Sequence, residues 1–116
     1  MTWERPATAV EVLYIDGCPN LEALMASLRA IIGAADGAVR VTLREVRSDE
    51  EARALRFVGS PTVRVDGRDV EPGIDACTSY GLGCRVYRAA NGVSGTPSVA
   101  LVLGALNCDE SAARRE

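Results

Sequence analysis

Residues 10–20 read VEVLYIDGCPN, and this stretch decides the fold of the chain. It opens with apolar side chains at both odd and even positions, which is typical of a central strand covered on both faces. A turn over residues 16–20 follows, and apolar residues then recur at helical spacing over residues 21–32. The domain is therefore predicted to begin with a buried strand, a turn that holds Cys18, and an amphipathic helix.

Cys18 is the first candidate functional residue. It lies between a predicted strand and the start of a helix, where backbone N–H groups and the helix dipole favour the thiolate form of a thiol. A single cysteine more often packs as a small hydrophobic side chain, so its position alone leaves both interpretations open. The sequence contains no histidine, which excludes Cys-His and Ser-His-Asp nucleophile pairs and HExxH metal sites within these residues.

Length and composition indicate one globular domain over residues 1–116, with a core over about residues 9–107. Hydrophobic residues make up 47% of the chain and charged residues 25%, as in ordinary soluble proteins. All thirteen basic residues are arginine, and they alternate with sixteen acidic residues, so no nucleic-acid interface is predicted. Without a signal sequence or an apolar stretch of about 20 residues, we expect a cytoplasmic protein with no membrane partner.

Turn and cap signals divide the remaining sequence into alternating strands and helices. The predicted elements are a strand over residues 39–43, β-like runs over residues 57–65 and 68–70, and helices over residues 49–55 and 96–106. Asp66 and Gly67 predict a tight hairpin between the last two strands. The final helix is predicted to start at Thr96 and Pro97 and to fray after Asn107.

A Gly-rich, polar stretch over residues 72–95 is predicted to be a long loop, which in a small domain is usually functional or mobile. It contains Cys77, Cys84 and a short β-like piece before the turn at residues 91–92. Pro61 is expected at the first position of its strand because it cannot donate to the ladder, and a cis or a trans bond fits there. The predicted order is β-α-β-α-β-β-α, an α/β domain with a long loop before the last helix.

This order, with a cysteine at the first strand-to-helix turn and a proline opening the third strand, resembles the thioredoxin-like fold with its mixed four-stranded sheet. The motifs that carry the resemblance are LYIDGCPN over residues 13–20, GSPTV over 59–63, VDGR over 65–68 and CRVY over 84–87. They are similar to those of small bacterial proteins described as thioredoxin family, DF-family (seleno)protein or alkylmercury-lyase-related. The resemblance covers residues 10–106.

The resemblance implies a thiol protein that exchanges thiols and disulfides without a cofactor. Cys18 matches the attacking cysteine, Pro61 matches the cis-proline, and Ser60 is the residue whose backbone would line the thiol site. The resolving position of the usual C-x-x-C motif holds Leu21, which excludes an ordinary local dithiol cycle because leucine cannot release a mixed disulfide. The implied partner is a small-molecule thiol or a protein disulfide.

Three outcomes are open for such a thiol. In the first outcome, Cys84, or with less support Cys77, attacks the mixed disulfide on Cys18 from the loop. In the second, a small thiol in solution resolves that mixed disulfide instead. Alternatively, Cys18 and Cys84 together bind a soft metal ion such as Hg(II), Cu(I) or Zn(II). Geometry decides between these outcomes, since a disulfide requires Cα atoms within about 7 Å of each other.

Three further interpretations complete the sequence analysis. Asp16 is a candidate acid for an organomercurial lyase, although a turn aspartate more commonly bonds to its own backbone. Cys108 is interpreted as incidental. A non-catalytic interaction domain, with the edge strand over residues 68–70 and the loop as contact surfaces, is the remaining alternative function.

Overall fold

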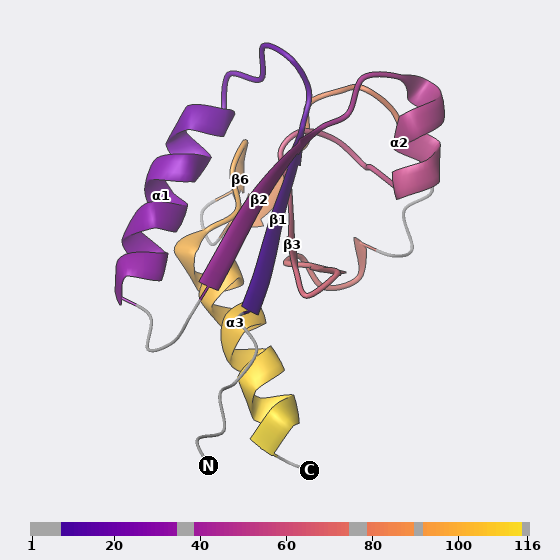
Figure 1. Ribbon diagram of the computed structural model, residues 1–116. Helices are drawn as coiled ribbons and strands as arrows, with labels where there is room; N and C mark the ends of the chain where they lie inside the picture. The colour runs from indigo at the N-terminus through magenta and orange to yellow at the C-terminus, as the bar shows by residue number, and fades with distance from the viewer. Residues whose placement is uncertain (1–7, 35–38, 75–78, 90–91, 115–116) are drawn as a thin grey trace.

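The computed structural model describes residues 8–34, 39–74, 79–89 and 92–114. Over these residues it is a mixed α/β domain with three helices, a four-stranded sheet and a separate two-stranded sheet (Figure 1). The elements are β1 Thr8–Tyr14, α1 Leu21–Ala34, β2 Val39–Glu45, α2 Asp49–Leu55, β3 Thr62–Val65, β4 Arg68–Asp69, β5 Tyr87–Ala89, β6 Gly92–Ser94 and α3 Val99–Arg114. None of these helices is long and apolar enough to cross a membrane.

The four-stranded sheet has the order β2-β1-β3-β4, with β1 in the interior as its apolar pattern predicts. β1 runs parallel to β2 and antiparallel to β3, so that Val12 lies opposite Leu43 on one side and Val63 on the other. β3 and β4 form the predicted hairpin, and their turn residues Asp66 and Gly67 have φ angles of 49° and 86°. The sheet is therefore mixed, and β4 is one of its edges.

Both faces of the four-stranded sheet are covered (Figure 1). The larger core lies under α1 and α3 and comprises the buried residues Val10, Val12, Leu24, Leu28, Ile31, Val63, Val65, Val70, Tyr87 and Val102. The smaller core lies under α2 and comprises Leu13, Val46, Ala52 and Phe57. Val12 and Leu13 on β1 thus point into different cores, which explains why apolar residues occupy both odd and even positions of this strand.

The structure corrects the predicted boundaries of the last helix. α3 starts at Val99 and not at Thr96, because Ser98 caps it: the Leu101 N–H donates to Ser98 Oγ at 3.1 Å. The helix also continues to Arg114, past the expected fraying point. Thr96 and Pro97 belong to the segment that leads into the helix.

The third strand begins where Pro61 predicts, whereas the long loop differs from the prediction. β3 covers Thr62–Val65, directly after Pro61, while the first residues of the β-like run over 57–65 serve the end of α2, where the Phe57 N–H donates to the Ala52 carbonyl at 2.8 Å. The stretch over residues 72–95, predicted as a loop, contains the two strands of the β5-β6 hairpin. The helix over residues 49–55 has the predicted bounds, and its cap Ser48 accepts the Glu51 N–H at 3.1 Å.

Candidate functional site

Cys18 lies in the turn between β1 and α1, where the sequence predicts it; this turn is at the top of Figure 1. The Cys18 N–H donates to the Ile15 carbonyl at 3.2 Å, and the Cys18 carbonyl accepts the Leu21 N–H at 3.4 Å. Gly17, with a φ angle of 73°, adopts the left-handed conformation that the turn requires. Cys18 is half-buried, and α1 begins three residues later. Leu21, at the position of a resolving cysteine, packs against the larger core.

Ser60 connects the Cys18 turn to the start of β3. Its side chain is fully buried, and its Oγ accepts the Ile15 N–H at 3.1 Å. The peptide bond between Ser60 and Pro61 is cis, and Pro61 is buried as well. Since Ile15 also accepts the hydrogen bond from Cys18, a chain of two hydrogen bonds leads from Cys18 to Ser60.

Cys84 is bridged to Ser60 through the backbone, whereas the Cys18 turn is bonded to the Ser60 side chain. The Ser60 N–H donates to the Gly83 carbonyl at 2.7 Å, and the Arg85 N–H donates to the Ser60 carbonyl at 3.0 Å. Cys84 therefore stands opposite Ser60 in a parallel bridge, with a backbone spacing of about 4.8 Å expected for neighbouring strands. Cys84 is exposed. Ser60, Pro61 and Cys84 thus lie together, and the turn that holds Cys18 is bonded to Ser60 through Ile15.

A buried ion cluster holds the segment that carries Cys84. The Arg85 side chain is 3% exposed and forms a two-pronged ion pair with Asp69, at 2.6 and 2.7 Å. It also donates to Thr62 Oγ1 at 3.2 Å and pairs with Glu71 at 3.2 Å. The guanidinium lies 4.1 Å from the centre of the Tyr87 ring, which favours a cation. Buried ion pairs of this kind require accurate geometry, and this one ties residues 84–87 to the β3-β4 hairpin.

Electrostatics in the cluster keep Arg85 charged. Burial alone disfavours the charged guanidinium, but the hydrogen bond to Asp69, together with the charges around it, raises the pKa of Arg85 above its ordinary value. Burial raises the pKa of the Tyr87 hydroxyl, against the opposing effect of the Arg85 charge. The Tyr87 hydroxyl stays protonated and donates to the Pro61 carbonyl at 2.5 Å. Within the described part of the chain, Arg85 Nε is a buried donor without a partner.

The backbone at Gly59 packs closely against Arg85. A methyl group on Gly59 would lie 2.8 Å from Arg85 Cβ, and the φ angle of 137° is one that other residues rarely adopt. A second close approach occurs at Gly95, where a methyl group would lie 2.7 Å from Cγ of Asn20, two residues after Cys18. The segment that contains Cys84 and the β5-β6 hairpin therefore contacts the thiol site at both of its ends.

Arg85 and Asp69 were not among the predicted site residues, although Arg85 belongs to the CRVY motif and Asp69 to the predicted edge strand. No short motif joins positions 16 residues apart. The available signal was the CRVY motif at residues 84–87, in which Arg85 and Tyr87 occupy alternate positions of a β-like piece and so share one face. Cys77 lies outside the described residues, as does the side chain of Cys108, and Asp16 is exposed in the Cys18 turn.

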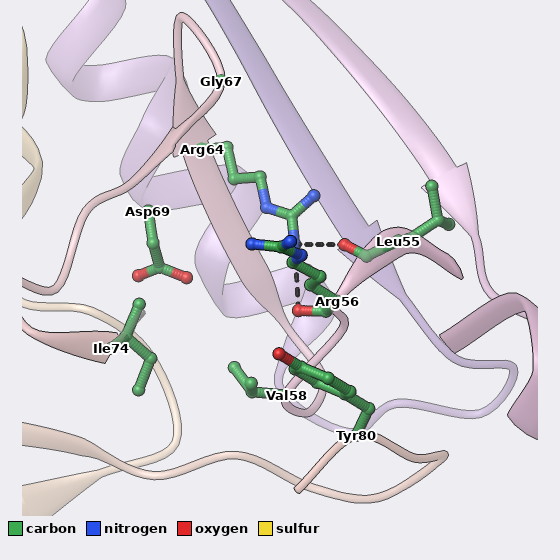
Figure 2. Close-up of a pocket in the computed structure, with 8 residues that line it drawn as sticks. All are labelled: Leu55, Arg56, Val58, Arg64, Gly67, Asp69, Ile74 and Tyr80. Atoms are coloured by element: carbon green, nitrogen blue, oxygen red, sulfur yellow. Dashed lines mark hydrogen bonds between the residues drawn. The ribbon is translucent and has the colours of Figure 1, made fainter. Parts of the chain in front are cut away.

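A pocket of about 180 Å³ lies beside α2, and Asp69, the ion-pair partner of Arg85, is among the residues that line it. Figure 2 shows the Arg64 side chain reaching into it and donating to the carbonyls of Leu55 and Arg56 at 2.7 and 3.1 Å. These bonds satisfy two carbonyls at the end of α2. None of the four predicted site residues lines this pocket.

The described residues provide two thiols for a metal ion but no group of three or more Cys, Asp or Glu side chains with the spacing of a metal site. The chemistry that this arrangement can support is that of two thiols, one half-buried and one exposed, on segments that hydrogen-bond to a common serine. No family model, curated protein or solved structure matches this chain.

Proposed function

We propose that this chain is a thioredoxin-like thiol protein that exchanges thiols and disulfides, with Cys18 as the attacking thiol and Cys84 as its partner. One observation carries the proposal: the segments of both cysteines are hydrogen-bonded to Ser60, one through its Oγ and the other through its backbone. The element order and the mixed four-stranded sheet agree with such a fold. The exposure of Cys84 and the partial exposure of Cys18 allow a disulfide substrate to reach the sulfur atoms.

The reaction proceeds in two exchange steps. The Cys18 thiolate attacks one sulfur of a disulfide RS–SR, the S–S bond of the substrate breaks, and RS⁻ leaves and takes a proton from solvent. The Cys84 thiolate then attacks the Cys18 sulfur of the mixed disulfide and expels the second RS⁻. The substrate is reduced to two thiols, and the protein gains a disulfide between Cys18 and Cys84.

Peptide mapping after oxidation tests this proposal. The reduced protein is treated with bis(2-hydroxyethyl) disulfide, the remaining thiols are alkylated, and the digest is analysed by mass spectrometry. We expect a peptide pair joined through Cys18 and Cys84 that a dithiol reductant separates. In Cys84→Ser the same oxidation should stop at a 2-mercaptoethanol adduct on Cys18, whereas Cys108→Ser should behave as the wild type. Recovery of Cys18 as a free thiol, or joined to Cys77, contradicts the proposal.

Soft-metal binding by the same two cysteines is a second candidate. It is favoured by two thiols, one half-buried and one exposed, on segments that both hydrogen-bond to Ser60, since thiolates select soft ions such as Cu(I). Native mass spectrometry of the reduced protein with Cu(I) should then show one ion per chain. The complex should be lost in Cys84→Ser and kept in Cys108→Ser, and retention in Cys84→Ser contradicts this candidate.

A further inference from the structure

We propose that the thiol site reacts with small disulfides and excludes extended peptides, because the chain's own residues 83–85 occupy the backbone to which a peptide would bind. This inference rests on the proposed function and adds its substrate class. It depends on the hydrogen-bond partners of three consecutive residues, Gly59, Ser60 and Pro61.

An extended peptide adds to a protein by hydrogen bonding to free N–H and C=O groups along an exposed backbone edge. Beside the thiol site, the N–H of Ser60 and the carbonyls of residues 59–61 have their hydrogen-bond partners within the chain. Ser60 donates its N–H to the Gly83 carbonyl, and Pro61 has no N–H to offer. The carbonyls of Gly59, Ser60 and Pro61 accept from Thr62 Oγ1 at 2.6 Å, from the Arg85 N–H at 3.0 Å and from the Tyr87 hydroxyl at 2.5 Å.

The covering segment is firmly attached. To uncover Ser60, residues 83–85 would have to move away, and Arg85 would have to leave Asp69, whose side chain is 7% exposed. That movement would leave a nearly buried carboxylate without its cation. Gly59, which approaches Arg85 within van der Waals contact, would also lose its packing. The closed arrangement is therefore the resting state of the site.

A small disulfide needs none of these backbone groups. Its reaction requires only that one sulfur reach the Cys18 thiolate in line with the bond that breaks. Cys18 is half-buried and Cys84 is exposed, so a substrate that presents little more than its sulfur atoms has access to both. A peptide that carries the same disulfide has to place its backbone against an edge that is already paired.

Two matched probes test the inference. The small probe is bis(2-hydroxyethyl) disulfide, and the peptide probe is an unstructured peptide of about ten residues whose central cysteine carries the same 2-mercaptoethanol disulfide. The rate of oxidation of Cys18 by each probe is measured by quenching and mass spectrometry. Each rate is divided by the rate of the same probe with free N-acetylcysteine, which removes the intrinsic reactivity of the disulfide.

We expect the normalised rate to be at least about tenfold higher for the small probe, because access to the sulfur limits the exchange. In Asp69→Asn, which weakens the attachment of Arg85, the peptide rate should rise toward that of the small probe. Hydrogen exchange of the wild type gives a second measurement that does not depend on this variant. The Ser60 amide should stay protected when a cysteine-free version of the peptide is added in excess.

Two results overturn the inference. Equal normalised rates for both probes on the wild type show that the covering segment does not select against peptides. A change in Ser60 protection on addition of the cysteine-free peptide shows that the peptide displaces residues 83–85. Failure of the proposed function has a different signature: Cys18 then reacts with both probes no faster than Cys108 does in the same protein.

Discussion

The two segments that carry the thiols are attached to the fold by different kinds of contact. The Cys84 segment is fixed by a buried ion pair, by the hydrogen bond from the Tyr87 hydroxyl to the Pro61 carbonyl and by a backbone bridge. Among the described residues, the Cys18 turn is joined to its neighbours by the hydrogen bond from the Ile15 N–H to Ser60 and by the packing of Asn20 against Gly95, and it closes on itself around Gly17. The segment predicted to be a loose loop is thus the more firmly held of the two. In a disulfide cycle we therefore expect the Cys18 turn, and not the Cys84 segment, to make the adjustment that bond formation requires.

Removal of Arg85 should have the largest effect on stability. In Arg85→Leu the Asp69 carboxylate remains buried without its cation, and we expect the free energy of unfolding to fall by about 3–5 kcal/mol. Urea denaturation followed by circular dichroism measures the change. Arg68→Leu is the matched control, because Arg68 is exposed on the same hairpin, and its effect should stay within about 0.5 kcal/mol.

The double variant Arg85→Leu/Asp69→Leu sharpens this test. It removes the unpaired carboxylate along with the cation, so it should recover part of the stability that the single variant loses. Equal stability of the wild type and Arg85→Leu would show that the ion cluster does not anchor the Cys84 segment, and the contrast between the two segments would disappear.

Ser60→Ala should have the next largest effect, on the Cys18 side. The Ile15 N–H loses its acceptor at a partly buried position, and we expect a loss of about 1–3 kcal/mol in the free energy of unfolding. The control is Ser79→Ala, at an exposed position, which should leave the urea midpoint unchanged. Hydrogen exchange of the Ile15 amide should quicken in Ser60→Ala alone. An unchanged Ile15 amide contradicts the assignment of Ser60 as the residue that holds the Cys18 turn.

The strands and helices were predictable where one local signal dominated. The apolar run of β1, the Ser48 cap with Glu51 and the Asp66-Gly67 turn each specify an element within a few residues of sequence, and the structure confirms all three. The start of α3 was predicted wrongly because two cap signals compete there. Thr96 followed by proline is a plausible start, but the hydrogen bond is made by Ser98.

The site was predictable only in part, for a physical reason. Cys18, Ser60 and Pro61 belong to motifs that can be recognised locally. The anchor of Cys84, by contrast, depends on Arg85 meeting Asp69 across 16 residues of chain, and sequence spacing gives no sign that a charged residue will be buried. Of the β5-β6 hairpin, the sequence indicated only a β-like piece before the turn at residues 91–92, since its strands have three residues each and too few positions to show alternation.

The Tyr87 hydroxyl gives the cluster a signature at high pH. Burial raises its pKa above the ordinary value of about 10. Above pH 10 the unfolded chain releases this proton while the folded chain keeps it, so the free energy of unfolding should fall by up to about 1.4 kcal/mol per pH unit. This stabilisation is fully present below pH 10 and is lost as the pH rises toward the raised value.

Tyr87→Phe isolates that contribution. At neutral pH it should cost about 0.5–1.5 kcal/mol, because the Pro61 carbonyl loses its donor. Above pH 10 its stability should decline less steeply than that of the wild type, so the two curves should converge. Urea titrations between pH 7 and 11 measure both effects, and Tyr80→Phe, which leaves Tyr87 in place, should follow the wild-type curve. Parallel curves for the wild type and Tyr87→Phe would contradict the burial of this hydroxyl.

Cys84→Ser should have the smallest effect on stability, within about 0.5 kcal/mol, because the Cys84 side chain is exposed and the bridge to Ser60 uses only backbone atoms. This variant therefore separates the thiol from the segment that carries it. If Cys84 is the partner of Cys18, its disulfide chemistry should be lost while the urea midpoint stays where it was. A loss above about 1 kcal/mol in the free energy of unfolding would mean that the Cys84 sulfur itself contributes to packing. The sulfur could then not be assigned to chemistry alone, nor the attachment of the segment to its backbone alone.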